Sequence, residues 1–254
     1  MRKTAFASDF DGTLCESDWN LGIEHFDPAN LEAVRAYQAA GGLFGICTGR
    51  PLTSIVDSMR GRLELDFYIV TTGAQVLDGR LDPIVVREID LDVVAGLHER
   101  FAREDMGFIV VTETQFASVG GPAGPGIDPI RSVGEVRPPV YDVSLEYLDD
   151  EDAARTACAQ VNEQFGNAVA AFQNRGSVDI VPAGCSKGSG VRAVREALGV
   201  DCIAGIGDSY NDLPLLEAAD VSYTFYQAPE EVRVAADHVV GSVAQALEHF
   251  MSLP

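Results

Sequence analysis

The sequence lacks long hydrophobic runs. No segment approaches the roughly 18 uncharged apolar residues that a membrane-spanning helix needs. Arg2 and Lys3 resemble the start of a signal peptide, but Asp9 and Asp11 interrupt any apolar region behind them. The composition therefore predicts a cytoplasmic protein that has no membrane partner.

Basic residues are also scarce. Only 18 Lys and Arg stand against 39 Asp and Glu, so the chain of 254 residues has a formal net charge of −21. Such a field repels nucleic acid, which is therefore not an expected partner. A small phosphorylated ligand is repelled as well, unless a metal ion and a few local cations reverse the sign at its site.

Residues that form disulfides or zinc sites are few and widely spaced. The five cysteines are odd in number and include no C-x-x-C pair, so they are expected to be free thiols in a reducing compartment. The four histidines show no zinc-ligand spacing. What remains is an ordinary globular composition, with 46% hydrophobic and 22% charged residues.

Both ends of the chain alternate between apolar strands and amphipathic helices. Asp27-Pro28 has the pattern of a helix N-cap followed by proline in the first turn, and Gly41-Gly42 closes that helix. Strand, helix, strand, helix, strand at this rhythm predicts an α/β fold with a doubly wound parallel sheet of Rossmann-like type. The strands are expected near residues 5–8, 43–47, 67–72, 202–207 and 221–225, and the helices near 28–40, 51–63, 187–198 and 213–219.

The middle of the chain follows a different pattern. Apolar residues alternate from Tyr141 to Tyr147, which favours an antiparallel sheet covered on one side. Half of residues 120–139 are Gly or Pro, so this stretch is expected to be an exposed loop without regular structure. The sequence thus predicts a smaller α+β domain, residues 83–183, inserted into a discontinuous α/β domain of residues 1–82 and 184–254.

The first apolar run ends in two carboxylates, Asp9 and Asp11. A buried carboxylate costs several kcal/mol unless a cation or strong donors compensate it, and the ligand sites of open α/β sheets lie at the carboxyl ends of strands. Asp9 is the expected nucleophile of a phosphoryl transfer, since a carboxylate can accept the phosphoryl group as a mixed anhydride. Asp11 is the expected general acid and base, which protonates the leaving oxygen and then activates water.

A hard cation and a local positive charge complete such a site. Asp9, Asp208 and the backbone carbonyl of Asp11 are oxygen ligands suited to Mg²⁺. Lys187, at the start of an expected helix, would offset negative charge on Asp9 and on the phosphate. The sequence therefore predicts a magnesium site shared by acids that lie far apart along the chain.

Donors for the phosphate oxygens are found in two further places. Thr48 and the amides of Gly12 and Gly49 are suited to this role. Taken alone, each of these clusters fits a turn, an N-cap or a solvated helix end. Because all of them follow an expected strand or begin an expected helix, their placement favours one shared phosphoryl-transfer site.

Taken jointly, the motifs D-F-D-G-T-L, T-G-R, S-K-G and G-D-S-Y-N-D are similar to the four motifs of the haloacid dehalogenase superfamily of phosphohydrolases. The long insertion between the second and third motifs resembles the Cof-like sugar-phosphatase branch, and it implies that the insert is a cap domain that sets substrate specificity. Two features depart from the family's pattern. They are the Gly/Pro-rich loop and the long segment 15–26, which fits either a flap or a surface loop.

The resemblance also implies roles for single residues. Asp208 would be a further metal ligand, Thr48 and Lys187 would bind the phosphoryl group, and Asn211 would contact phosphate or substrate. Asp212 would orient Lys187 or a metal-bound water. Arg50 fits either a leaving-group contact or a structural ion pair.

The sequence therefore predicts a Mg²⁺-dependent phosphatase that acts on a small phosphorylated metabolite, a sugar phosphate above all, through an aspartyl-phosphate. It is expected to act as a monomer or a homodimer. One alternative is a phosphomutase on the same scaffold, with the two acids passing the phosphoryl group between sugar positions. The other is a non-catalytic, phospho-ligand-binding regulatory module, which would not need two acids facing a phosphate.

Overall fold

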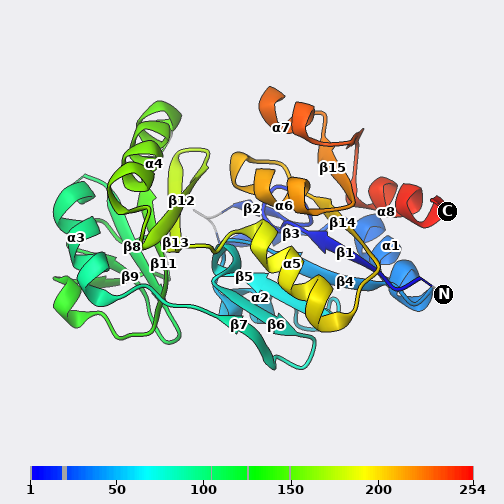
Figure 1. The fold of residues 1–254 in the computed structure, drawn as a ribbon, viewed down its shortest axis with the longest axis horizontal. Coiled ribbons are helices and arrows are strands. Elements are labelled where there is room, and N and C mark those ends of the chain that lie inside the picture. The colour runs from blue at the N-terminus through cyan, green and yellow to red at the C-terminus, as the bar shows by residue number, and fades with distance from the viewer. Residues whose placement is uncertain (1, 19–21, 104, 125, 149, 254) are drawn as a thin grey trace. The chain divides into compact units, whose positions relative to one another are not determined.

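The computed structural model describes residues 2–18, 22–103, 105–124, 126–148 and 150–253 (Figure 1). The chain divides into two compact units. The α/β unit consists of Met1–Val86 and Ser186–Pro254, and the inserted unit consists of Arg87–Cys185.

The α/β unit is built on an eight-stranded sheet with the strand order β16-β15-β14-β1-β4-β5-β6-β7. The strands from β16 to β5 run parallel, which confirms the predicted doubly wound fold. β1 lies between β14 and β4, and its residues Ala5–Ser8 are all buried. The parallel strands are β1 (Thr4–Ser8), β4 (Leu43–Cys47), β5 (Phe67–Val70), β14 (Cys202–Ile206), β15 (Val221–Phe225) and β16 (His238–Val240).

Helices cover both faces of this sheet. On one face, α1, α2 and α8 pack around a core that includes Phe6, Phe44 and Phe250. On the other face, α5 and α6 pack around Ile203 and Leu215. Because both faces are covered, the central strands are continuous apolar runs rather than alternating ones. The helices of this unit are α1 (Pro28–Ala39), α2 (Leu52–Met59), α5 (Lys187–Leu198), α6 (Leu213–Ala218), α7 (Glu230–Ala235) and α8 (Val243–Ser252).

The helix ends follow the local sequence signals. At the start of α1, a carboxylate oxygen of Asp27 accepts a hydrogen bond from the Ala29 amide at 2.8 Å. At the start of α5, Ser186 and Ser189 form a reciprocal capping box. This cap fixes the backbone immediately before Lys187, the first residue of α5.

The boundary between the two units lies a few residues later than the sequence suggests. β6 (Gln75–Asp78) and β7 (Pro83–Val86) extend the sheet of the α/β unit by two antiparallel strands. Residues 83–86 therefore belong to that sheet and not to the insert, because β7 is hydrogen-bonded to β6. The inserted unit begins at Arg87.

The inserted unit has a six-stranded sheet with the order β10-β9-β8-β11-β13-β12. Its neighbouring strands are antiparallel except β9 and β10. Helices α3 (Leu91–Phe101) and α4 (Glu151–Phe165) bury a core with one face of the sheet, including Val143 and Leu145. The strands are β8 (Gly107–Thr112), β9 (Phe116–Val119), β10 (Asp128–Ile130), β11 (Val140–Glu146), β12 (Val169–Asn174) and β13 (Ser177–Pro182).

Short elements occur in both segments for which the sequence predicts no strand or helix. In segment 15–26, β2 (Glu16–Asp18) and β3 (Ile23–His25) form an antiparallel hairpin. In segment 120–139, β10 and the 3-10 helix η2 (Val133–Glu135) interrupt the expected irregular loop. Elements of three residues are too short to show a periodic pattern, and β10 tolerates its proline because it is an edge strand.

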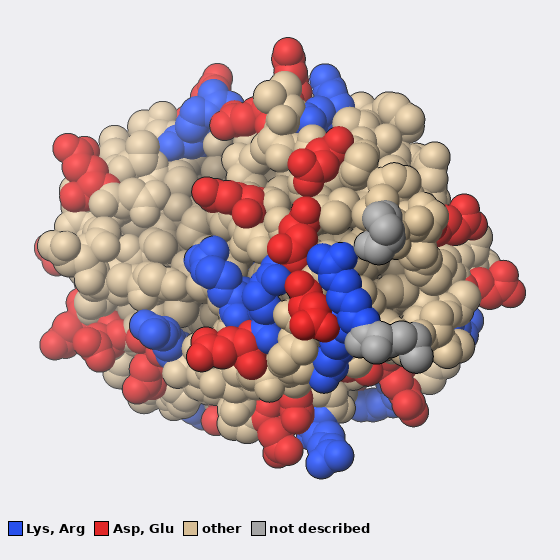
Figure 2. All heavy atoms as spheres, turned by 45° about the vertical axis from the view of Figure 1, so that its right-hand side comes forward, with Lys and Arg blue, Asp and Glu red and all other residues tan. Residues whose placement is uncertain are grey.

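Charged side chains of both signs are exposed on the protein surface. On the face drawn in Figure 2, acidic side chains are spread across the surface with basic side chains among them. Within the described parts of the chain, no helix is both long enough and apolar enough to cross a membrane.

Candidate active site

The carboxyl ends of adjacent parallel strands bring predicted site residues together. Asp9 follows β1, and its amide donates to the Ile206 carbonyl of β14 at 2.9 Å. Asp208 follows β14, and Thr48 follows β4. Gly12 has a φ of +76°, and a Cβ at this position would lie 2.8 Å from Oδ2 of Asp208. Glycine is therefore required here both for the backbone conformation and for the close approach to Asp208.

Lys187 supplies a buried positive charge at this edge of the sheet. Its side chain is 1% exposed, and its Nζ lies 2.7 Å from Oδ1 of Asp9 and 2.6 Å from Oδ1 of Asp212. Burial lowers the pKa of Lys187, but the charges of Asp212 and Asp9 outweigh this and raise the pKa well above its ordinary value. Lys187 is therefore protonated and holds two buried carboxylates in place.

Asp212 connects the lysine to the loop after β14. It ends the 3-10 helix η3 (Tyr210–Asp212) and is fully buried. Its Oδ1 accepts from Lys187, and its Oδ2 accepts from the amides of Asp208 and Ser209 at 2.9 and 3.0 Å. Because both oxygens already have donors, this carboxylate orients the lysine and the loop that carries Asp208.

Three buried carboxylates form a group that fits a divalent cation. Asp9, Asp208 and Asp212 each offer one oxygen, and these atoms all lie within 4.8 Å of one another. Since Asp212 uses both oxygens as hydrogen-bond acceptors, Asp9 and Asp208 are the better metal ligands. Burial and the charges of Asp212 and Asp208 raise the pKa of Asp9 well above its ordinary value, although Lys187 opposes this. The three carboxylates offer oxygen donors and negative charge of the kind that Mg²⁺ requires.

The predicted phosphate-binding groups differ in whether their hydrogen-bond donors already have a partner within the protein. Thr48 is 1% exposed, and its Oγ1 accepts from the Arg50 amide at 3.1 Å, which leaves its own hydroxyl hydrogen to donate. The Gly12 amide, by contrast, donates to the carbonyl of Cys15 at 2.9 Å. In this structure the turn uses this amide, and its binding of phosphate stays a prediction. Asn211 lies in η3 beside Asp212 and is buried.

A turn that sequence reasoning missed supports the Thr48 loop. In η1 (Thr71–Gly73), the amides of Thr71 and Thr72 donate to the carbonyls of Arg50 and Thr48, each at 3.0 Å. Both threonines have positive φ, 47° and 49°. This conformation is strained for β-branched residues, and such strain is concentrated at functional sites. The available signal was Thr-Thr-Gly directly after a buried strand.

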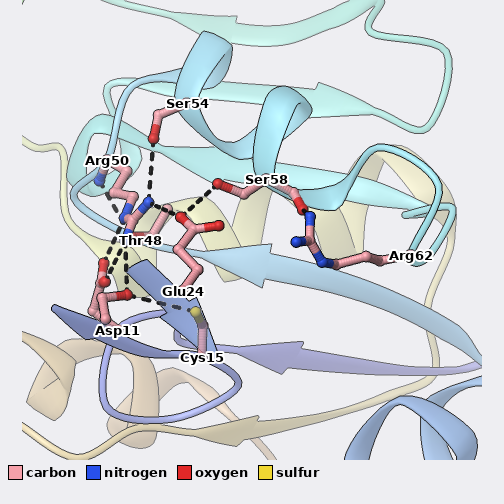
Figure 3. Close-up of polar contacts among 9 residues, drawn as sticks. Asp11, Cys15, Glu24, Thr48, Arg50, Ser54, Ser58 and Arg62 are labelled. Carbon is pink, nitrogen blue, oxygen red and sulfur yellow. Dashed lines mark hydrogen bonds and ion pairs between the residues drawn. The ribbon is translucent and has the colours of Figure 1, made fainter. Parts of the chain in front are cut away.

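Asp11 does not join the acidic group. Its carboxylate is bound by the guanidinium of Arg50, with Nη2 to Oδ1 at 2.6 Å and Nε to Oδ2 at 2.8 Å (Figure 3). Arg50 thus makes an ion pair, which is one of the two roles expected for it. A contribution of Asp11 to a metal site rests on its backbone carbonyl.

Comparisons with known proteins agree with this arrangement. HMP-PP phosphatase of an Enterobacter species is 24% identical over 97% of this chain and 93% of its own length. Phosphoglycolate phosphatase of Methanothermobacter thermautotrophicus is 25% identical over 97% of this chain and 98% of its own length. The solved structure of a HAD subclass IIB sugar phosphatase has a TM-score of 0.80 at 21% identity, covering 99% of this chain and all of that one.

The family match covers most of both units. The model of the haloacid dehalogenase-like hydrolases matches residues 6–121 and 132–249, and these ranges include all four motifs that carry the resemblance in the sequence. The resemblance is confirmed, and the chain belongs to the haloacid dehalogenase-like hydrolase family.

Proposed function

We propose that this hydrolase is a Mg²⁺-dependent phosphatase that cleaves a sugar phosphate through an aspartyl-phosphate on Asp9. One observation carries the proposal. Asp9 sits at the carboxyl end of the central strand, 2.7 Å from the protonated Lys187, with an oxygen of Asp208 close enough to share a cation. This is the combination of nucleophile, fixed charge and hard-ion ligands that phosphoryl transfer requires.

The residues of the chain divide the chemistry into two steps. In the first, a carboxylate oxygen of Asp9 attacks phosphorus, the bond from phosphorus to the leaving oxygen breaks, and Asp11 gives that oxygen a proton. In the second, Asp11 takes a proton from water, the water oxygen attacks phosphorus, and the carboxylate of Asp9 is released with inorganic phosphate. Lys187 and the hydroxyl of Thr48 hold the phosphoryl oxygens.

Asp9, Asp208 and the backbone carbonyl of Asp11 would hold Mg²⁺. When bound there, the ion supplies positive charge that offsets the repulsion between Asp9 and the phosphate. The three buried acids beside Lys187 support this assignment.

The inserted unit, Arg87–Cys185, is proposed to be the cap that selects the leaving group. It has its own sheet and hydrophobic core, which makes it a separate structural unit inside the hydrolase. The proposal of a sugar phosphate is supported by the likeness to a sugar phosphatase, whereas the two curated relatives are named for HMP-PP and phosphoglycolate. These three compound classes define the first substrates to compare.

A phosphate-release assay on hexose phosphates, phosphoglycolate, HMP-PP and p-nitrophenyl phosphate tests the proposal. We expect release that depends on Mg²⁺ and is highest for a hexose phosphate. Asp9→Asn should lower it by at least about 10⁴-fold while the circular dichroism spectrum stays unchanged. Retained turnover in this variant would mean a different nucleophile, and an isomerised sugar phosphate as the product would mean a mutase.

A further inference from the structure

The guanidinium group of Arg50 binds the Asp11 carboxylate at two points. Both carboxylate oxygens of Asp11 accept from Arg50, Oδ2 from Nε at 2.8 Å and Oδ1 from Nη2 at 2.6 Å. A two-point bond of this kind fixes the plane of the carboxylate as well as its position. The side chain of Asp11 is nevertheless 30% exposed, compared with 7% for Arg50. The carboxyl group of Asp11 is therefore fixed by the buried Arg50 and remains partly accessible to solvent.

Arg50 has no donor left for a substrate. Its Nη1 donates to Oε1 of Glu24 at 2.6 Å and to Oγ of Ser54 at 3.3 Å, and its Nη2 donates to Oγ of Ser17 at 2.9 Å. With the two bonds to Asp11, these contacts use the five N–H groups of a guanidinium. Because its N–H groups are engaged in this way, Arg50 fits a positioning role better than a contact to the leaving group.

The guanidinium is also fixed in its own plane. It lies over the ring of Phe10, with 4.6 Å between Cζ and the ring centroid. Phe10 stands between the two acids in the sequence and is fully buried, so the surface against which Arg50 rests cannot shift without disturbing the core. The arginine is thus constrained by bonds at its edge and by a ring at its face.

Glu24 anchors this arrangement from the hairpin β2–β3. Its Oε1 accepts from Arg50 and also from Oγ of Ser58 in α2 at 2.7 Å, as Figure 3 shows. One carboxylate of the hairpin therefore binds both Arg50, which follows β4, and α2. Glu24 and Ser17 of this hairpin are therefore connected to Asp11 through Arg50.

We infer that Arg50, held by Glu24, is a positioning residue that presents Asp11 to the leaving oxygen of the substrate. The inference rests on the proposed function, because it assigns Asp11 the proton transfer to that oxygen. It predicts that a loss at Arg50 or Glu24 acts through Asp11. The loss should therefore depend on how much the leaving group needs a proton.

Two substrates with different leaving groups test this dependence. A hexose phosphate releases a strongly basic alkoxide, whereas p-nitrophenyl phosphate releases a weakly basic phenolate. The readout is kcat/KM, which reports only the first step. Arg50→Lys keeps the positive charge and removes the two-point hydrogen bond to Asp11. It should lower kcat/KM for the hexose phosphate by about 100-fold and for p-nitrophenyl phosphate only several-fold.

Glu24→Gln is the milder variant, since it keeps the shape of the side chain and removes only the charge. It should show the same selectivity with a loss of about 10-fold. In an Asp11→Asn background, Arg50→Lys should add no further selective loss, because the group through which it acts is already gone. Two matched controls should leave kcat/KM for both substrates unchanged. They are Arg195→Lys, at an ion pair with Asp220, and Glu16→Gln, in the same hairpin.

Equal losses on both substrates, no loss, or additivity with Asp11→Asn would overturn the inference. Its failure is distinguishable from failure of the proposed function. If the wild-type chain releases no phosphate, the function itself is wrong. If the wild type is active and Asp11→Asn is selective for the hexose phosphate while Arg50→Lys is not, only the role of Arg50 is wrong.

Discussion

Each of the two units buries acidic side chains, and the units differ in whether a positive charge lies beside these acids. In the α/β unit, Asp9 and Asp212 are both bound by the ammonium group of Lys187. In the inserted unit, Asp142 of β11 is 3% exposed, and its Oδ2 has no hydrogen-bond partner among the described residues. Burial, followed by the nearby charges of Asp179 and Glu146, raises the pKa of Asp142 well above its ordinary value.

The difference shows what distinguishes a reactive acid from a buried one. Burial alone favours a protonated, neutral carboxyl group, and that is the state toward which Asp142 is driven. At Asp9 the same tendency is opposed by Lys187, and Asp208 lies close enough to share a cation with it. The compensating charge, and not the burial, supports the proposal that the α/β site carries the chemistry.

The largest expected effect comes from removing that charge. Lys187→Met leaves Asp9 and Asp212 buried without their cation, so the free energy of unfolding of the α/β unit should fall by about 3–5 kcal/mol. Urea unfolding followed by circular dichroism measures it. The only other lysine of the chain, Lys3, is exposed, and Lys3→Met should cost no more than about 0.5 kcal/mol. Equal effects of the two substitutions would remove the contrast between the units.

A smaller effect is expected from the metal ion. Mg²⁺ at about 100 times its dissociation constant should stabilise the wild-type fold by about 2.7 kcal/mol, because it binds only the folded site. Thermal unfolding with and without Mg²⁺ should show an increase of the melting temperature in the wild type and none in Asp208→Asn. Asp57→Asn, at an exposed ion pair with Arg60, is the control that should keep the wild-type response. A full response in Asp208→Asn would exclude Asp208 as a ligand.

The smallest effect concerns the acid of the inserted unit. Because the folded pKa of Asp142 is raised above that of the unfolded chain, its contribution to stability is fully present below pH 3.8 and is lost as the pH rises through the folded value. Asp142→Asn should therefore match the wild type near pH 4 and be more stable by about 1–2 kcal/mol at pH 8.

Hydrogen exchange of the β11 amides, measured across this pH range, follows the stability of the inserted unit separately. Asp152→Asn is the control, since the Asp152 side chain is 90% exposed in α4. A stability gain that does not change with pH would show that Asp142 is not driven toward its neutral form.

Local signals in the sequence predicted a large part of this structure. Asp27-Pro28 marks the start of α1, and Ser186 caps the helix that carries Lys187. The acids were found because they stand directly after buried strands, where parallel strand ends share one edge of the sheet. These features depend on neighbours in the chain, so the sequence alone contains them.

Features that depend on tertiary partners were not predicted. Alternation along β11 marks one covered face, yet Asp142 on the opposite face is buried as well. The ion pair of Arg50 with Asp11 joins residues 39 positions apart, and no periodic pattern distinguishes it from a contact to substrate. The hairpin β2–β3 was missed because strands of three residues show no periodicity.

Direct detection of the phosphorylated residue tests the central claim, that Asp9 is the nucleophile held beside Lys187. The enzyme is mixed with substrate and Mg²⁺, quenched in acid within a single turnover, digested, and its peptides are analysed by mass spectrometry. We expect a phosphoryl group on Asp9 in the wild type and none in Asp9→Asn. A phosphoryl group on another residue, or turnover with no phosphorylated peptide at any quench time, would contradict the account.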